Sequence, residues 1–541
     1  ESWKNLAEKA NEKLSEFAEQ LVISARSYQA KGQYKEAIEK YEQAAKIANE
    51  TDQEDIQATA YQHLGNVFAG SSEYKQAIQY YQKAREIFVN FEANEIELTA
   101  YQWLGYNHLK AGHHEESIDY YSEAAKLASQ LGCKTREVNA NIGIGSAHSN
   151  IGSFNPAEQH FLKAISLAES LNNKCLERDA HMHLGHVYLQ NSKLNEAVKS
   201  YLQVEKFSHD LGDKKQETSA CLMLANAFQQ VKQYENAIES YKKALNISEE
   251  LGDKEAQTQA VHGLGSISFN NNEYEKALAY TKILVELTDD DPNNNGREQA
   301  LAQKRLGMCY AHLERFEEAL TCFQKALDMV SDHPENALIG ILNEWCGYCC
   351  LSMEGKHQEG IKFYEQAIEI AKQYGEKYQE YRSNQAIANI LTIASSYQEA
   401  KQYCEEAVKT AMELGDKYCE AKSRLILASN YMKDCDYEMA KKEYENALDI
   451  LGAESNHDLL REKALTGLGV AFFNLGDTEM AVESIEKAKT FVKKETNTEL
   501  HNALETLENQ SSEEETTLPS HTPDAKDDKT SATITSFKES E

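Results

Sequence analysis

Residues 65–84 read GNVFAGSSEYKQAIQYYQKA and hold the pattern that decides the fold. Twelve residues after Gly65, Ala77 begins the motif Ala-x3-aromatic-x2-Ala, which Tyr81 and Ala84 complete. The motif recurs in about twelve copies with a period near 40 residues, and its first position is taken by Ala37, Ala77, Ser117, Ala157, Ala197, Ala237, Ala277, Ala319, Gly360, Ala400, Ala440 and Ala481. A repeat of this length is typical of a unit that cannot bury its apolar face alone, so we expect the copies to stack.

The small residue that precedes each motif indicates how the repeat is built. It is glycine in eight copies: Gly65, Gly105, Gly145, Gly185, Gly265, Gly307, Gly347 and Gly469. Glycine within a helix costs about 1 kcal/mol relative to alanine, so a packing reason is needed. We expect each repeat to be two antiparallel helices, A and B, that cross closely at the small residue while the aromatic ring fills the gap. The linkers Leu-Gly-Asp-Lys at 211–214, 251–254 and 414–417 predict a glycine cap at the end of helix B.

The pattern small-x11-Ala-x3-aromatic-x2-Ala resembles the tetratricopeptide repeat over about residues 18–495. The 40-residue period with Leu-Gly-Asp-Lys linkers is similar to the subclass found in animal G-protein-signalling modulators, rapsyn and tetratricopeptide repeat protein 28. The resemblance implies an all-α fold, namely a right-handed α-solenoid whose A helices line a concave groove. In such a groove the family binds extended or helical peptides.

The sequence predicts five segments along the chain. They are an N-terminal helical segment (1–17), repeats 1–7 (18–290), repeats 8–12 (291–495), a C-terminal capping helix (496–510) and a disordered acidic tail (511–541). Repeat 7 suggests the central division, since Thr281 and Leu284 replace the aromatic and alanine and a polar linker follows at 288–296. The alternative explanation of this linker is a two-residue insertion in a surface loop. The tail lacks hydrophobic periodicity and is rich in Ser, Thr and charge.

Composition excludes several classes of function. The 56 Lys and Arg stand against 88 Asp and Glu, a net charge of -32, which argues against nucleic acid and anionic lipid as partners. No apolar run approaches the ~18 residues of a membrane helix. The 11 scattered cysteines suggest no disulfide framework, and we therefore expect a reducing, cytoplasmic location. Because the chain starts at Glu1, a preceding domain stays open.

Motifs for catalysis, cofactors and metals are missing from the sequence. There is no phosphate-binding Gly-x4-Gly-Lys-Ser/Thr loop, no Gly-x-Ser-x-Gly and no His-Glu-x2-His. His181, His183 and His186 lack further ligands at metal spacing, and we expect them to be ordinary groove or packing histidines. Cys346, Cys349 and Cys350 lie in a predicted helix without a second cysteine pair, which favours buried thiols. We predict no catalytic residue, cofactor or metal.

The resemblance implies which helix A positions face the groove. These positions hold eight basic but only three acidic residues (Glu19, Asp179 and Glu344), which favours an acidic or amphipathic peptide. Acidic residues placed on outer faces would give the same count. The predicted groove residues are Asn66, Trp103, Tyr106, Lys110, His183, His186, Asn226, Lys304, Arg305, Trp345, Tyr348, Arg382, Asn389 and Lys422. Trp103 and Trp345 fit either an interface or packing between A helices.

The sequence therefore predicts a non-catalytic scaffold for protein–protein interaction in the cytoplasm, in signalling or cytoskeletal organisation. An alternative is the ligand-sensing or regulatory arm of a larger enzyme or receptor. RNA binding is disfavoured because the basic excess in the groove is small and dispersed.

Overall fold

The computed structural model describes residues 2–89, 94–289, 296–330, 336–452 and 457–491. Within these ranges the chain forms 24 α-helices and no strand. The helices divide between two compact arrays, which we call the N-terminal array (Glu1–Cys309) and the C-terminal array (Tyr310–Glu541). The all-α prediction is confirmed. The predicted capping helix (496–510) and acidic tail (511–541) lie outside the described residues.

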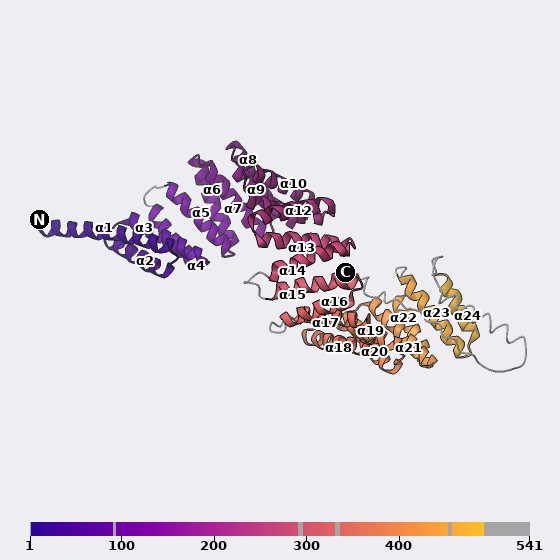
Figure 1. Cartoon of the computed structure of the whole chain (residues 1–541). Helices are drawn as coiled ribbons and strands as arrows, with labels where there is room; N and C mark the ends of the chain where they lie inside the picture. The colour runs from indigo at the N-terminus through magenta and orange to yellow at the C-terminus, as the bar shows by residue number, and fades with distance from the viewer. Residues whose placement is uncertain (1, 90–93, 290–295, 331–335, 453–456, 492–541) are drawn as a thin grey trace, which may run out of the picture. The chain divides into compact units, whose positions relative to one another are not determined.

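The N-terminal array contains the first fourteen helices and most of the fifteenth (Figure 1). Their bounds are α1 Ser2–Ala30, α2 Tyr34–Glu50, α3 Glu54–Gly70, α4 Tyr74–Val89, α5 Asn94–Lys110, α6 His114–Gln130, α7 Lys134–Asn150, α8 Phe154–Ser170, α9 Lys174–Gln190, α10 Leu194–Asp210, α11 Lys214–Gln230, α12 Tyr234–Leu251, α13 Lys254–Asn270, α14 Tyr274–Asp289 and α15 Arg297–His312. The predicted segment 1–17 continues into repeat 1 as the single helix α1.

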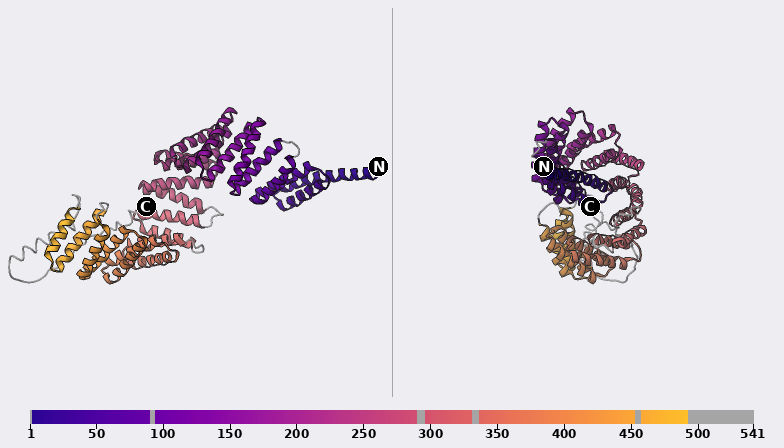
Figure 2. Two further views of the ribbon diagram at one scale, coloured as in Figure 1. Left: turned by 180° about the vertical axis from the view of Figure 1, so that it is seen from behind. Right: turned by 90° about the vertical axis from the view of Figure 1, so that its left-hand side faces the viewer.

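The C-terminal array contains the remaining helices, and each array shows its helices stacked beside their sequence neighbours when viewed from behind (Figure 2). Their bounds are α16 Phe316–Val330, α17 Asn336–Leu351, α18 His357–Tyr374, α19 Lys377–Ile393, α20 Tyr397–Leu414, α21 Lys417–Lys433, α22 Tyr437–Leu451, α23 Asp458–Asn474 and α24 Thr478–Lys489. The predicted division at 290/291 stays a prediction.

Contacts between helices two apart identify the inner layer of each array. Among the described helices, all such pairs that touch substantially are odd-numbered, for example α5 with α7 and α11 with α13 in the N-terminal array, and α19 with α21 in the C-terminal array. Helices on the inside of a curved stack lie closer together than those outside. The odd-numbered helices, which carry the small residues of the repeat, therefore form the concave layer.

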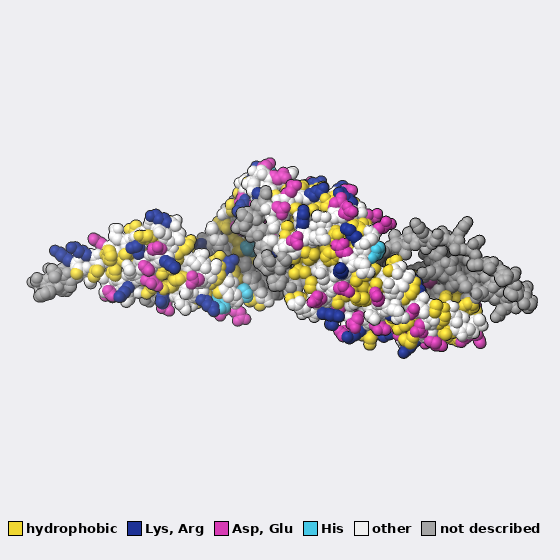
Figure 3. Space-filling view, turned by 60° about the horizontal axis from the view of Figure 1, so that its bottom comes forward, with side chains coloured by type: hydrophobic (Ala, Val, Ile, Leu, Met, Phe, Trp, Pro, Cys, Tyr) yellow, Lys and Arg dark blue, Asp and Glu magenta, His cyan; other side chains and the backbone are white. Residues whose placement is uncertain are grey.

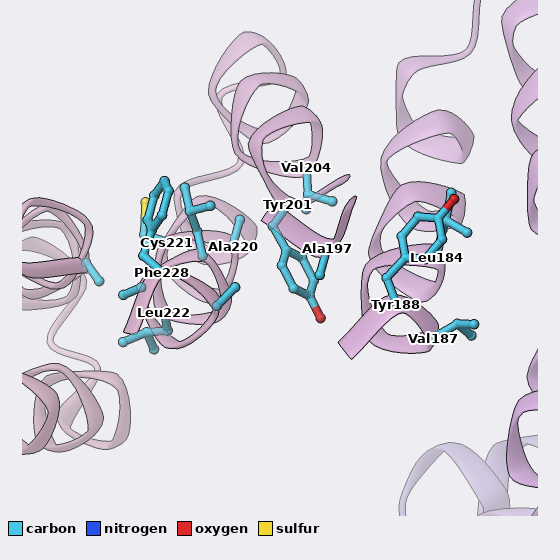
Figure 4. Packing of buried hydrophobic residues seen from close by; sticks show 14 of the residues in the cluster. Leu184, Val187, Tyr188, Ala197, Tyr201, Val204, Ala220, Cys221, Leu222 and Phe228 are labelled. Atoms are coloured by element: carbon cyan, nitrogen blue, oxygen red, sulfur yellow. The ribbon is translucent and has the colours of Figure 1, made fainter. Parts of the chain in front are cut away.

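The glycines of helix A make room for the aromatic rings of helix B. A Cβ atom on Gly185 would lie 2.6 Å from the Tyr201 ring, and one on Gly105 would lie 2.8 Å from the Tyr121 ring. Figure 4 shows Tyr201 reaching from α10 between α9 and α11, with its hydroxyl directed away from α10. The prediction that each helix glycine leaves room for an aromatic ring is confirmed for these two repeats, because ring atoms fill the space beside the glycine.

Turn chemistry explains where helix B ends. Gly212, Gly252 and Gly415 of the three Leu-Gly-Asp-Lys linkers have φ of 66°, 67° and 70°, a left-handed conformation that glycine adopts without a steric penalty. The aspartate that follows each glycine accepts a hydrogen bond from the backbone N–H three residues later and so caps the next helix. The predicted glycine cap is confirmed.

Candidate functional site

A hollow of about 810 Å³ opens on the inner layer of the N-terminal array. Three odd-numbered helices, α11, α13 and α15, form most of its wall, and α12 and α14 contribute side chains from behind. Its apolar wall is made of Leu222, Leu284, Leu287, Leu301 and Ala302. A size of several hundred Å³ with an apolar wall and a few polar groups is typical of ligand sites.

Two of the predicted groove residues, Asn226 and Arg305, line this hollow together. The Tyr241 hydroxyl, from α12, donates a hydrogen bond to Asn226 Oδ1. Arg305 Nη1 donates to Ser266 Oγ at 2.8 Å. Both polar side chains are therefore held by neighbours rather than disordered in solvent, which lowers the entropy lost on binding a ligand.

His262, on α13, is the histidine that lines the hollow. Burial, followed by the charge of Arg305, lowers the pKa of His262 to about 4. The imidazole is neutral at pH 7, so it can donate and accept hydrogen bonds there without adding charge. Lys254, Arg305, Glu255 and Glu298 also line the hollow and balance one another in formal charge.

The predicted residues of repeat 3 lie further along the same layer. Trp103 is half-buried and packs against the Tyr81 ring at a centroid distance of 5.0 Å. Tyr106 is exposed, and Lys110 Nζ lies 5.6 Å from its ring centroid. In the neighbouring repeat, Asn66 Oδ1 accepts a hydrogen bond of 2.7 Å from Tyr81. Trp103 thus contributes to packing, while Tyr106 is exposed and has Lys110 beside its ring.

Repeat 9, in the C-terminal array, repeats this aromatic arrangement. The half-buried Trp345 ring stacks on Phe323 at 5.6 Å and meets Tyr348 edge-on at 5.8 Å. Arg382 forms an ion pair with Glu344, which is only 1% exposed. Glu344 is therefore unavailable to a ligand, and the prediction that it lines the groove is wrong because Arg382 and Ser383 of the next A helix cover it.

The other candidates in and near the C-terminal array do not gather into one site. Asn389 and Lys422 are half-buried on α19 and α21, while Lys304, on α15 of the N-terminal array, does not line its hollow. A second hollow, of about 490 Å³, lies between α20, α21 and α22 and contains none of the predicted residues. Of the predicted set, Asn226 and Arg305 line the hollow of about 810 Å³ together.

The histidines of repeat 5 are packing groups. His183 stacks on Phe161 at 5.6 Å, and His186 meets the Tyr201 ring edge-on at 5.7 Å. Burial lowers the pKa of His181, His183 and His186. No group of three or more ligating side chains that could hold a metal occurs among the described residues.

Cys346, Cys349 and Cys350 are buried as predicted, and burial raises the pKa of each thiol.

Within the described ranges, no helix combines the length and the apolar character that a membrane-spanning segment needs. Acidic and basic side chains are interspersed on the face of the molecule seen in Figure 3, where no single-sign surface stands out.

Sequence reasoning missed the wall of the hollow. Leu284 and Leu287 come from helix B of repeat 7, where Leu284 replaces the usual alanine. That departure from the motif is visible in the sequence, where it suggests the division between repeats 7 and 8. A large aliphatic side chain at a position that normally holds alanine is also a signal of a local change in surface shape.

Family models for the tetratricopeptide repeat match residues 21–88, 98–131, 138–171, 179–208, 218–251, 300–333 and 462–491. No curated protein matches the chain. Among solved structures, BtubC (BKLC) from P. vanneervenii is 18% identical, covering 41% of this chain and 92% of that one with a TM-score of 0.37.

The apo form of RapI is 15% identical to this chain and covers 66% of it and 98% of RapI, with a TM-score of 0.48. The apo form of the quorum sensor NprR from B. thuringiensis is also 15% identical, covering 64% of this chain and 98% of NprR with a TM-score of 0.38.

Proposed function

Because the chain contains tetratricopeptide repeats in both arrays, we propose that it is a non-catalytic scaffold that binds peptide segments of protein partners along its inner layer. The observation that carries the proposal is the hollow of about 810 Å³ that α11, α13 and α15 form on this layer. A stacked array offers a large contact area without a large conformational change.

The side chains in this hollow suit a peptide. Leucines on the wall offer an apolar surface for an aliphatic or aromatic side chain, and burial of such a side chain stabilises a complex by about 1.5–3 kcal/mol. Asn226, His262 and Arg305 offer hydrogen bonds to polar groups of the same segment.

We propose that the preferred peptides are acidic or amphipathic. Lys110, Arg305 and Lys422 belong to the basic residues at inner positions, and they favour carboxylates. The formal charges lining the hollow balance, so the amphipathic character would dominate there. We further propose a cytoplasmic role in signalling or cytoskeletal organisation, on the resemblance of the 40-residue period to G-protein-signalling modulators, rapsyn and tetratricopeptide repeat protein 28.

The experiment is selection of a random dodecapeptide library on the full chain, followed by fluorescence anisotropy of the enriched peptides. We expect sequences that combine aliphatic and acidic residues. Failure to enrich any peptide, or enrichment of basic sequences only, would contradict the proposal.

Two tryptophan variants separate a role in binding from a role in packing. If Trp103 or Trp345 contacts the peptide, alanine at that position weakens binding while the melting temperature stays near wild type. If the ring serves only the core, the melting temperature falls and any binding that remains is unchanged once the folded fraction is taken into account.

A further inference from the structure

We propose that Tyr241 is a positioning residue that fixes the Asn226 amide so that its two N–H donors face the hollow of the N-terminal array. The hollow would then select a peptide that places a carbonyl or carboxylate oxygen on Asn226 and an aliphatic side chain against the leucine wall. This inference rests on the proposed function and deepens it.

The geometry of the amide supports the first step. The Tyr241 hydroxyl can donate only one hydrogen, and it donates to Asn226 Oδ1, while Gln229 Oε1 lies 3.2 Å away. Because oxygen and nitrogen occupy opposite sides of a planar carboxamide, holding Oδ1 against Tyr241 turns Nδ2 away from it. Asn226 lines the hollow and is exposed, so its Nδ2, which Tyr241 does not hold, can meet a ligand there.

The apolar surroundings support the second step. Leu222 and Leu284 are 7% and 5% exposed, and Leu301, at 36%, reaches further into solvent. An amide donor beside such a wall is matched by a ligand that carries an acceptor next to an aliphatic group. A ligand that presents a donor to Nδ2 instead would leave both donors without an acceptor, and we expect it to bind about tenfold more weakly.

Two other repeats show that the hydrogen bond of the tyrosine hydroxyl depends on which inner residue faces the ring. In repeat 2 the Tyr81 hydroxyl makes the same bond to Asn66, at 2.7 Å. In repeat 5 the equivalent inner residue is His186, and the fully buried Tyr201 hydroxyl has no hydrogen-bond partner in the described part of the chain. Tyr201 is therefore a natural control, because it has the same ring and the same place in the repeat without a side chain to orient.

The test uses the full chain and the best dodecapeptide selected on it from a random library. Asn226→Asp keeps an oxygen that accepts from Tyr241 but removes both amide donors, and we expect about tenfold weaker binding or more. Tyr241→Phe frees the amide, and we expect binding weaker by about three- to tenfold. Tyr201→Phe should bind like wild type.

A double variant separates positioning from general weakening. If Tyr241 acts through Asn226, then Asn226→Ala with Tyr241→Phe binds no more weakly than Asn226→Ala alone. Additive losses, or a Tyr241→Phe protein that binds like wild type, would overturn the inference. If Tyr241→Phe does not fold, unchanged binding by Asn226→Asp overturns it as well.

The outcomes distinguish the inference from the function on which it rests. A peptide that binds tightly but ignores Asn226→Asp leaves the scaffold proposal standing and removes this one. A library that enriches no peptide removes both.

Discussion

The two arrays share one fold but differ in the ionisable groups that burial affects. In the N-terminal array burial lowers the pKa of eight histidines, among them His63 and His262 with values of about 4. The C-terminal array instead buries the charged side chains Glu344, Glu380, Lys401, Glu443, Arg461 and Glu462. Only Glu137 and Glu217 are comparably buried charges among the described residues of the N-terminal array.

This difference indicates which array has polar side chains available to a ligand. Buried charges of the C-terminal array are committed to internal pairs, such as Arg382 with Glu344 and Lys401 with Asp434. In the N-terminal array, Asn226 and His262 line the hollow and can hydrogen-bond to a ligand. We therefore propose that a peptide binds the N-terminal array and that Arg382 has a structural role.

The largest expected effect is loss of the buried ion pair. Arg382→Ala leaves the 1% exposed Glu344 without its cation, which should lower the free energy of unfolding of the C-terminal array by about 3–5 kcal/mol. Arg26→Ala, which removes a hydrogen bond from an exposed arginine to His63, should change the N-terminal array by less than about 1 kcal/mol. Urea unfolding measures the free energy of unfolding of both variants. Equal losses would contradict the difference between the two arrays.

Glycine substitutions test a feature that the arrays share. Alanine at Gly185 or Gly347 would place a Cβ 2.6 or 2.7 Å from the Tyr201 or Tyr364 ring, so each should destabilise its own array by about 1–3 kcal/mol. Gly265 is the matched control, because Thr281 replaces the aromatic ring in this repeat. A Cβ atom added at Gly265 would lie 3.6 Å from its nearest neighbouring atom. Gly265→Ala should stabilise the protein by about 1 kcal/mol. Thermal melting that shows destabilisation at Gly265 too would contradict this packing.

Acid should weaken the N-terminal array selectively. A histidine whose folded pKa lies below its unfolded value takes up protons mainly on unfolding, so the stability it contributes falls as the pH drops from about 6.5 towards 4. For His63 and His262, partial exposure reduces the expected loss to about 1 kcal/mol each at pH 5. Burial raises the pKa of Glu344, which acts in the opposite sense: its contribution falls as the pH rises through that pKa.

The measurement for this prediction is hydrogen exchange of both arrays at pH 7 and pH 5. We expect faster opening of the N-terminal helices at pH 5 and a smaller acid effect in His63→Gln and His262→Gln. Equal acceleration of both arrays would refute the assignment to these histidines.

The smallest expected effect distinguishes two tyrosines of the N-terminal array. Tyr81→Phe loses the bond to Asn66 and should cost about 1 kcal/mol, whereas Tyr201→Phe removes an unpaired buried hydroxyl and should be neutral or slightly stabilising. Denaturant titration of the two variants checks the difference, which should vanish if the Tyr201 hydroxyl has an undetected partner.

The sequence predicted those features that repeat. The period, the paired helices, the glycine caps and the ring beside Gly105 or Gly185 follow from residues that recur at fixed spacing, because each repeat contacts only its neighbours. The features that it did not predict depend on contacts between unlike repeats. Glu344 is covered by Arg382 of the following repeat, and the hollow owes its wall to Leu284, where repeat 7 departs from the motif.

Hydrogen–deuterium exchange of the full chain, with and without a selected dodecapeptide, tests most directly whether a peptide binds the inner layer of the N-terminal array. We expect protection on α11, α13 and α15, with the even-numbered outer helices unchanged except for α12 and α14 beside the hollow. Protection confined to the C-terminal array, or to the outer helices α8 and α10, would contradict it.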